Sequence, residues 1–110
     1  MDGAHKGIQL AEFDDHNVVG ISGSFAFHLQ SDFRKAYESI SKTTVSVVLD
    51  FGGVDYMDSS GLGMLLVMKK YLDDAKVSYE ITNSRDQTLD LLKMTHFDKF
   101  FKINGDDIHE

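Results

Sequence analysis

The sequence predicts a single α/β domain: a mixed β-sheet of about five strands, with an N-terminal antiparallel hairpin and helices packed on the sheet. Strand-like and helix-like segments alternate along most of the 110 residues, which is typical of parallel strands joined by crossover helices. The first two strand-like segments instead follow each other directly, as in a hairpin. No proline, repeat or low-complexity linker divides the chain. We therefore expect residues 1–110 to be one domain, with a core over about 7–103 and an acidic tail over 104–110.

The hairpin is predicted from two short segments with partly alternating apolar residues, 7–13 and 17–22, separated by DDHN. Asp and Asn favour tight turns because their short side chains bond to nearby backbone groups. A helix is expected over about 30–41, since apolar residues recur there at the spacing of one helix face. The residues on that face are Leu29, Phe33, Ala36, Tyr37 and Ile40.

The middle of the chain predicts a central strand followed by a second helix. Residues 43–51 are rich in β-branched residues and nearly continuously apolar, as expected for a strand covered on both faces. GGVDYM after it is expected to be a loop. The second helix is expected in the segment 58–74 with Asp58 as its N-cap, because an aspartate can accept a hydrogen bond from an unpaired N–H of a first helical turn. Met64 and Met68 in this helix are expected to fill the core.

The C-terminal third predicts one more strand, helix and strand. Residues 76–82 alternate between apolar and polar, with Val77, Tyr79 and Ile81 on one face. Ser84 and Gln87 have the spacing of a capping box, so a third helix should run to about residue 95. The sequence KFFKI at 99–103 reads as the last strand.

Composition and charge exclude several functional classes. The formal net charge is −7 and the eleven Lys and Arg residues are scattered, so no nucleic-acid partner is expected, because phosphate contacts dominate such binding. Cysteine is absent, which excludes thiolate chemistry, and the five histidines lack metal-site spacing. No signal peptide or membrane-spanning stretch is recognisable. We expect a cytoplasmic protein without metal, cofactor or membrane partner.

The segment DSSGLG at 58–63 raises the question of function, because two hydroxyls and two glycines lie where a strand gives way to a helix. A hydrolase nucleophile is disfavoured, since the required glycine two residues before the serine is replaced by Met57 or Asp58. A phosphate-binding loop fits the helix start, but the segment contains no lysine and no third glycine. In a purely structural interpretation, Asp58 and the two serines cap the helix and the two glycines let it pack tightly on the sheet. This interpretation leaves a redundancy unexplained, because one cap suffices and each glycine costs about 1 kcal/mol in a helix relative to alanine.

A longer stretch, VVLDFGGVDYMDSSGLGMLLVMKKYL at 47–72, resembles the signature segment of the STAS domain in its single-domain form, the bacterial anti-sigma factor antagonists. The strand ending in Asp50, the apolar Val54 and Met57, the DSSGLG run and the apolar helix stand in the order typical of that family. A weaker similarity extends from about 8 to 103 and includes ISGSF and LLKMTHFDKFFKI.

The resemblance implies a protein-binding switch. Family members are phosphorylated on the serine directly after the signature aspartate, here Ser59. The phosphate comes from a partner that is both serine kinase and anti-sigma factor, with a GHKL-type ATPase fold, and a PP2C-like phosphatase removes it. The unphosphorylated antagonist holds the anti-sigma factor and so releases a sigma factor. A phosphate adds about −1.5 to −2 charges beside Asp58, which should weaken the complex.

We therefore predict a regulatory binding module and not an enzyme, with Ser59 as the phosphoacceptor and Ser60 as the second choice. We expect the following residues to form the partner-binding site: Phe25, His28, Asp58, Ser60, Gly61, Leu62 and Gly63. The two glycines should leave room for the partner to approach. Two alternatives remain: a scaffold or transporter-associated subunit of the same fold that is not phosphorylated, and a module that senses a nucleotide or anion at the helix start.

Overall fold

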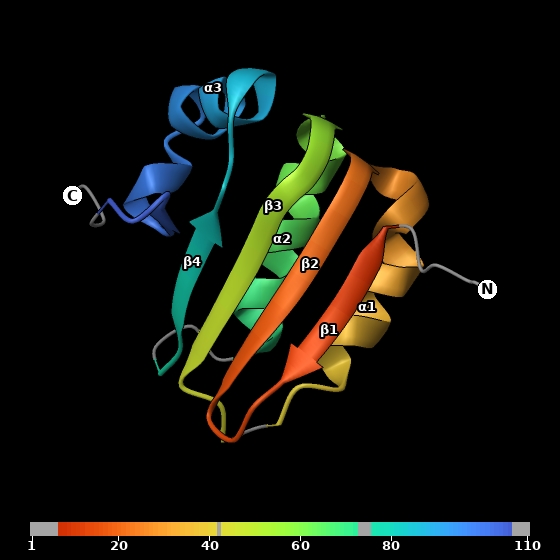
Figure 1. The fold of residues 1–110 in the computed structure, drawn as a ribbon, viewed down its shortest axis with the longest axis vertical. Coiled ribbons are helices and arrows are strands. Elements are labelled where there is room, and N and C mark those ends of the chain that lie inside the picture. The colour runs from red at the N-terminus through yellow and green to blue at the C-terminus, as the bar shows by residue number, and fades with distance from the viewer. Residues whose placement is uncertain (1–6, 42, 73–75, 107–110) are drawn as a thin grey trace.

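A five-stranded mixed sheet forms the centre of the fold in the computed structural model (Figure 1), which describes residues 7–41, 43–72 and 76–106. The elements in chain order are β1 (Ile8–Glu12), β2 (His16–Phe25), η1 (Phe27–Leu29), α1 (Gln30–Glu38), β3 (Ser46–Met57), α2 (Ser59–Tyr71), β4 (Ser78–Thr82), α3 (Asp86–Met94), η2 (Phe97–Lys99) and β5 (Lys102–Ile103). The strands lie in the order β1-β2-β3-β4-β5; β1 and β2 are antiparallel and the other neighbours are parallel. The predicted fold class is confirmed.

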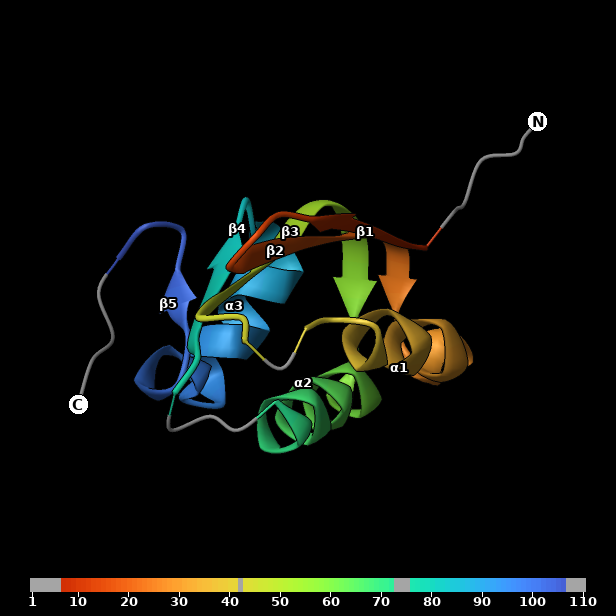
Figure 2. The same cartoon turned by 90° about the horizontal axis from the view of Figure 1, so that it is seen from below.

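Helices α1 and α2 lie side by side against one face of the sheet (Figure 2). Their apolar sides are buried, as the periodicity of the sequence predicts: Phe33 in α1 is 1% exposed, and Leu65 and Met68 in α2 are fully buried. Phe33 meets the ring of Phe25 from β2 edge to face, with 5.2 Å between the ring centroids. Because the crossovers follow parallel strands, α2 and α3 both begin at the edge where β3 and β4 end (Figure 1).

The central strand is longer than the sequence predicts. Residues 52–57 were expected to form a loop, but β3 continues to Met57 and pairs with an equally extended β2, so that Phe25 lies opposite Met57. Both side chains are fully buried, and this burial outweighs the weak strand tendency of the two glycines. A Cβ at Gly53 would lie 2.8 Å from the Cβ of Ser22, so the strands approach here as only glycine allows.

The C-terminal third departs from the prediction in two ways. Ser84 and Gln87 do not form a capping box; Arg85 precedes α3 without a side-chain cap. Gln87 instead clamps the end of β3, since the N–H of Met57 donates to its Oε1 at 3.1 Å and its Nε2 donates to the Met57 carbonyl at 2.8 Å. The predicted strand over 99–103 is reduced to β5, because η2 ends only at Lys99.

The start of the predicted tail is anchored rather than frayed. Asn104 Oδ1 accepts two hydrogen bonds from Ser84, one from the backbone N–H at 2.8 Å and one from the Ser84 hydroxyl at 3.0 Å. Asp106 donates its N–H to the carbonyl of Ile103 at 2.9 Å. The rest of that tail, 107–110, and the end of the second predicted helix, 73–74, lie outside the described residues.

Candidate functional site

Asp58 caps α2, as the sequence predicts. Its backbone is extended, and its Oδ1 accepts hydrogen bonds from the N–H groups of Ser60 at 3.0 Å and of Gly61 at 3.2 Å. The same oxygen accepts a third bond from the hydroxyl of Ser60 at 2.5 Å. The bond from the Ser60 side chain, helped by the backbone N–H groups, holds the pKa of Asp58 below its usual range. Asp58 is therefore a carboxylate at neutral pH and a weak proton acceptor.

The two adjacent serines have different surroundings. Ser59 is the first residue of α2 and is exposed, and within the described part of the chain its hydroxyl makes no hydrogen bond. Ser60 is partly buried, and its proton is committed to Asp58. An incoming reactant can therefore reach the Ser59 hydroxyl without breaking a bond within this protein, whereas reaction at Ser60 would remove a donor from the helix cap.

The two glycines also differ, and the expectation that both leave room for a partner is wrong for one of them. Gly61 is buried, and a Cβ there would lie 2.5 Å from the carbonyl oxygen of Phe25 and 2.8 Å from Cγ of Met57. Glycine at this position lets α2 pack against the ends of β2 and β3. Gly63 is exposed, and a Cβ there would meet nothing within 4 Å.

Of the two aromatic residues predicted to contact a partner, Phe25 and His28, only Phe25 is placed differently from the prediction. Phe25 was expected to contact a partner, but it lies in β2 and is fully buried, because its ring packs against those of Phe33 and Phe51. Its neighbour Phe27 is 65% exposed instead. His28 is exposed, as a partner-binding residue must be. Leu62 is only 8% exposed and belongs to the core.

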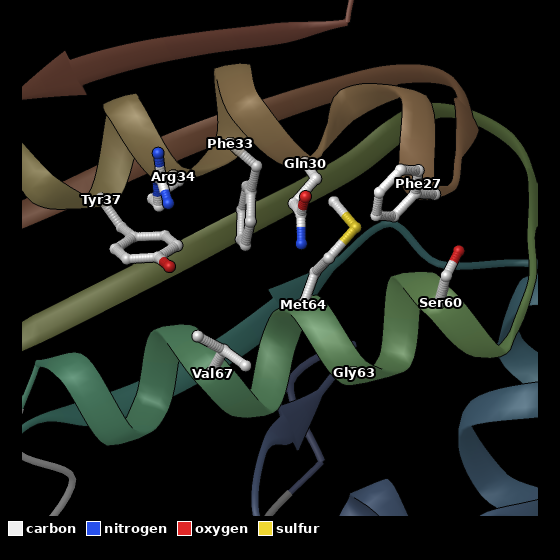
Figure 3. A pocket seen from close by; sticks show the side chains of 9 residues that line it. All are labelled: Phe27, Gln30, Phe33, Arg34, Tyr37, Ser60, Gly63, Met64 and Val67. Carbon is white, nitrogen blue, oxygen red and sulfur yellow. The ribbon is translucent and has the colours of Figure 1, made fainter.

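A groove of about 340 Å³ runs between α1 and α2 and reaches the start of α2 (Figure 3). Its lining residues are Phe27, Gln30, Phe33, Arg34, Tyr37, Ser60, Gly63, Met64 and Val67. From the sequence, Phe27 was considered together with Phe25 and His28 as an aromatic residue that could contact a partner, whereas Arg34 and Val67 were not assigned to the site. The helical periodicity could place Val67 outside the core, but the pairing of α1 with α2 that forms the groove is a tertiary feature without a local signal.

No helix among the described residues is long and apolar enough to cross a membrane.

Several solved structures have the same fold. The anti-sigma factor antagonist SpoIIAA in its unphosphorylated form matches with a TM-score of 0.67 at 16% identity, covering 88% of this chain and 86% of that one. The phosphorylated form of SpoIIAA from Bacillus matches with a TM-score of 0.63 at 16% identity, covering 88% and 90%. A sulfate transporter family protein from Wolinella succinogenes matches with a TM-score of 0.67 at 15% identity, covering 81% and 76%. At such identities the similarity establishes the fold alone.

Comparison at the sequence level is more specific. A STAS-domain containing protein of Pseudomonas aeruginosa (strain UCBPP-PA14) is 33% identical over 87 residues, which cover 79% of this chain and 86% of that protein. A model of the STAS domain family matches residues 7–107, a range that includes Asp58, both serines and both glycines of the site. The resemblance noted in the sequence is confirmed, and this chain belongs to the STAS domain family.

Proposed function

We propose that this protein is an anti-sigma factor antagonist that is switched by phosphorylation of Ser59. The observation that carries the proposal is the contrast between the two hydroxyls: Ser59 is exposed and makes no bond to any described residue, while Ser60 donates to Asp58 at 2.5 Å. Membership of the STAS family and the similarity in fold to SpoIIAA support it further. In this function the chain is a substrate and a binding partner rather than an enzyme.

The proposed partner is a serine kinase of the GHKL-type ATPase fold that also acts as the anti-sigma factor. Ser59 Oγ would form a bond to the γ-phosphorus of ATP while the bond from that phosphorus to the β–γ bridging oxygen breaks and ADP leaves. The hydroxyl proton would pass to a base of the kinase, because the lowered pKa of Asp58 makes that carboxylate a weak acceptor. A PP2C-like phosphatase would reverse the modification.

The switch would act through charge. Phosphorylation adds about −1.5 to −2 charges, and the positive end of the α2 dipole tolerates a negative group there, so the fold should survive. Asp58, however, is already ionised beside it. A partner that covers both groups would desolvate two neighbouring negative charges, which disfavours the complex. Phosphorylation should therefore release the kinase. The proposed function also places the protein in the cytoplasm, where sigma factors act.

The test is phosphorylation by purified GHKL-type ATPases from the source genome, each incubated singly with the chain and Mg-ATP. Intact mass and peptide mapping should find one phosphate on Ser59. Ser59→Ala should take up none, and Ser60→Ala, the matched control, should still be modified. Undiminished labelling of Ser59→Ala would overturn the assignment. Failure of every ATPase to modify the wild type would favour the unphosphorylated scaffold or transporter-associated alternative, for which the fold of the Wolinella succinogenes protein is the precedent.

The nucleotide- or anion-sensing alternative has less support. The N–H groups of Ser60 and Gly61, which would have to bind the anion, already donate to the Asp58 carboxylate. A second anion at this position would face the ionised Asp58. Equilibrium dialysis with labelled nucleotide separates this alternative from the proposed function, because only a sensor should bind nucleotide without a partner protein.

A further inference from the structure

The groove between α1 and α2 presents apolar side chains on both of its walls. Phe27 in η1, just before α1, is 65% exposed, and Val67 in α2 is 58% exposed. Phe33 and Met64 close the floor, at 1% and 7% exposure. Figure 3 shows Phe27 at the end of the groove where Ser60 lies, with Val67 further along α2. Large exposed apolar side chains that share one groove are typical of a binding surface.

Gly63 keeps the groove open. Its backbone is helical and it has open space where a Cβ would be, so the fold does not require glycine at this position. Glycine inside a helix nevertheless costs about 1 kcal/mol relative to alanine. Gly63 lines the groove, and a side chain there would narrow it beside Ser60. An occupant of the groove accounts for a glycine that the fold does not need.

Two cationic side chains lie in or near the groove, although the chain as a whole carries a net charge of −7. Arg34 lines the groove, and exposed Lys70 follows Val67 by three residues, which places the two on neighbouring parts of the α2 surface. Arg34 Nε lies 4.0 Å from Oε2 of Glu38, an exposed pair that a competing carboxylate can displace. Burial is the main cause that raises the pKa of Tyr37, so its phenol stays neutral.

We propose that the kinase docking surface extends from Ser59 into this groove. The groove would bind a segment of the kinase in which an apolar side chain lies next to a carboxylate. The apolar group sits between Phe27 and Val67, and the carboxylate meets Arg34. The inference rests on the proposed function, since a protein that brings ATP to Ser59 covers the adjoining end of the groove. A second copy of this chain is a poorer occupant, because two bodies of net charge −7 repel each other.

The test measures the affinity of the ATPase that phosphorylates Ser59, in its ADP-bound form, for wild type and variants by isothermal titration calorimetry. Phe27→Ala, Arg34→Glu and Gly63→Leu should each raise Kd by about tenfold or more. Lys35→Glu and Leu66→Ala are the matched controls, because both residues are exposed on the same helices but do not line the groove; they should leave Kd nearly unchanged. The loss in Arg34→Glu should shrink at high salt, and thermal unfolding should verify that each variant is folded.

The outcomes separate this inference from the proposed function. If the groove variants bind like the controls while wild type is phosphorylated on Ser59, the inference fails and the proposed function stands. If Lys35→Glu weakens binding as much as Arg34→Glu, the effect comes from general electrostatic attraction. The proposed contact between a kinase carboxylate and Arg34 is then wrong. If no ATPase binds or modifies wild type, both fail together. Loss of affinity confined to the groove variants, with Ser59 still modified at saturating kinase, supports both.

Discussion

Helices α2 and α3 both begin where a parallel strand ends, yet the polar residues at their starts serve different purposes. At α3 these side chains hold the fold together. Ser84 is bonded to Asn104 through both its N–H and its hydroxyl. Arg85 donates to a backbone carbonyl of β3 at 2.9 Å, and Gln87 bonds to both backbone groups of Met57. In this comparison α3 begins with a structural clamp.

At the start of α2 only some of the residues have a structural role of this kind. Asp58 and Ser60 cap the helix and Gly61 permits close packing. Ser59 and Gly63 neither cap the helix nor permit close packing. The hydroxyl of Ser59 makes no bond to a described residue, and a Cβ at Gly63 would meet open space. The difference indicates that function is to be sought in groups that the fold leaves unused. Each of the following predictions tests that division.

The largest effect is expected from the two glycines of α2. In Gly61→Ala the new methyl group would lie 2.5 Å from a backbone oxygen of β2, so the helix must shift away from the sheet. We expect a loss of about 3 kcal/mol in the free energy of unfolding, the upper end of the range for overpacking. Gly63→Ala should instead raise it by about 0.5 to 1 kcal/mol, because alanine is the better helix former.

Urea denaturation followed by circular dichroism measures both variants. The opposite signs of the two effects are the essential result. If Gly61→Ala is as stable as wild type, α2 does not lie close enough to β2 to exclude a Cβ at this position. The claim that Gly61 is needed for packing and Gly63 is not would then be wrong. If Gly63→Ala is destabilised, the fold uses this glycine after all.

An intermediate effect is expected from the serines at the two helix starts. Ser84→Ala removes the bond from a 5% exposed hydroxyl to Asn104 and should lower the free energy of unfolding by about 1 kcal/mol. Ser59→Ala removes no bond within the described chain and should change it by less than about 0.5 kcal/mol. Thermal unfolding of both variants in one buffer makes the comparison. Equal destabilisation by the two substitutions would contradict the claim that Ser59 is free.

The parts of this architecture that local sequence patterns encode were predictable. Alternating residues such as Tyr79 and Ile81 identify a strand because one face must be buried. Asp58 identifies a helix start because the cap is a local bond. The extension of β3 to Met57 was not predictable, because it depends on pairing with β2, and the glycines before it resemble a loop. The capping box at Gln87 failed for the same reason: its amide finds a partner in β3 that is distant in sequence.

The site was predictable to a similar extent. The DSSGLG motif located the start of α2, but the sequence cannot distinguish a glycine needed for packing from one that is not, since both follow a serine or leucine in the same helix. The contrast between Phe25 and Phe27 likewise depends on which residue ends β2. The groove has no local signature because its walls come from α1 and α2, which meet only in the folded chain.

The smallest effect concerns the charge of Asp58. Its pKa is lowered in the folded protein, chiefly by the hydroxyl of Ser60. A group of this kind contributes stability above its unfolded pKa, about 3.8, and loses that contribution as the pH falls through the lower folded value. Asp58→Asn keeps a capping side chain without the charge. The stability advantage of wild type over this variant should therefore be constant near neutral pH and shrink below pH 3.8.

Carbon NMR of the carboxyl group in Ser60→Ala sharpens the comparison between the two serines. The pKa of Asp58 should move back towards 3.8, since the first cause of its shift is removed while the backbone N–H bonds remain. In Ser59→Ala the pKa should stay where it is, because Ser59 makes no bond to the carboxylate. If both substitutions moved the pKa equally, the two hydroxyls would share the cap, and Ser59 could not react without weakening the start of the helix that presents it.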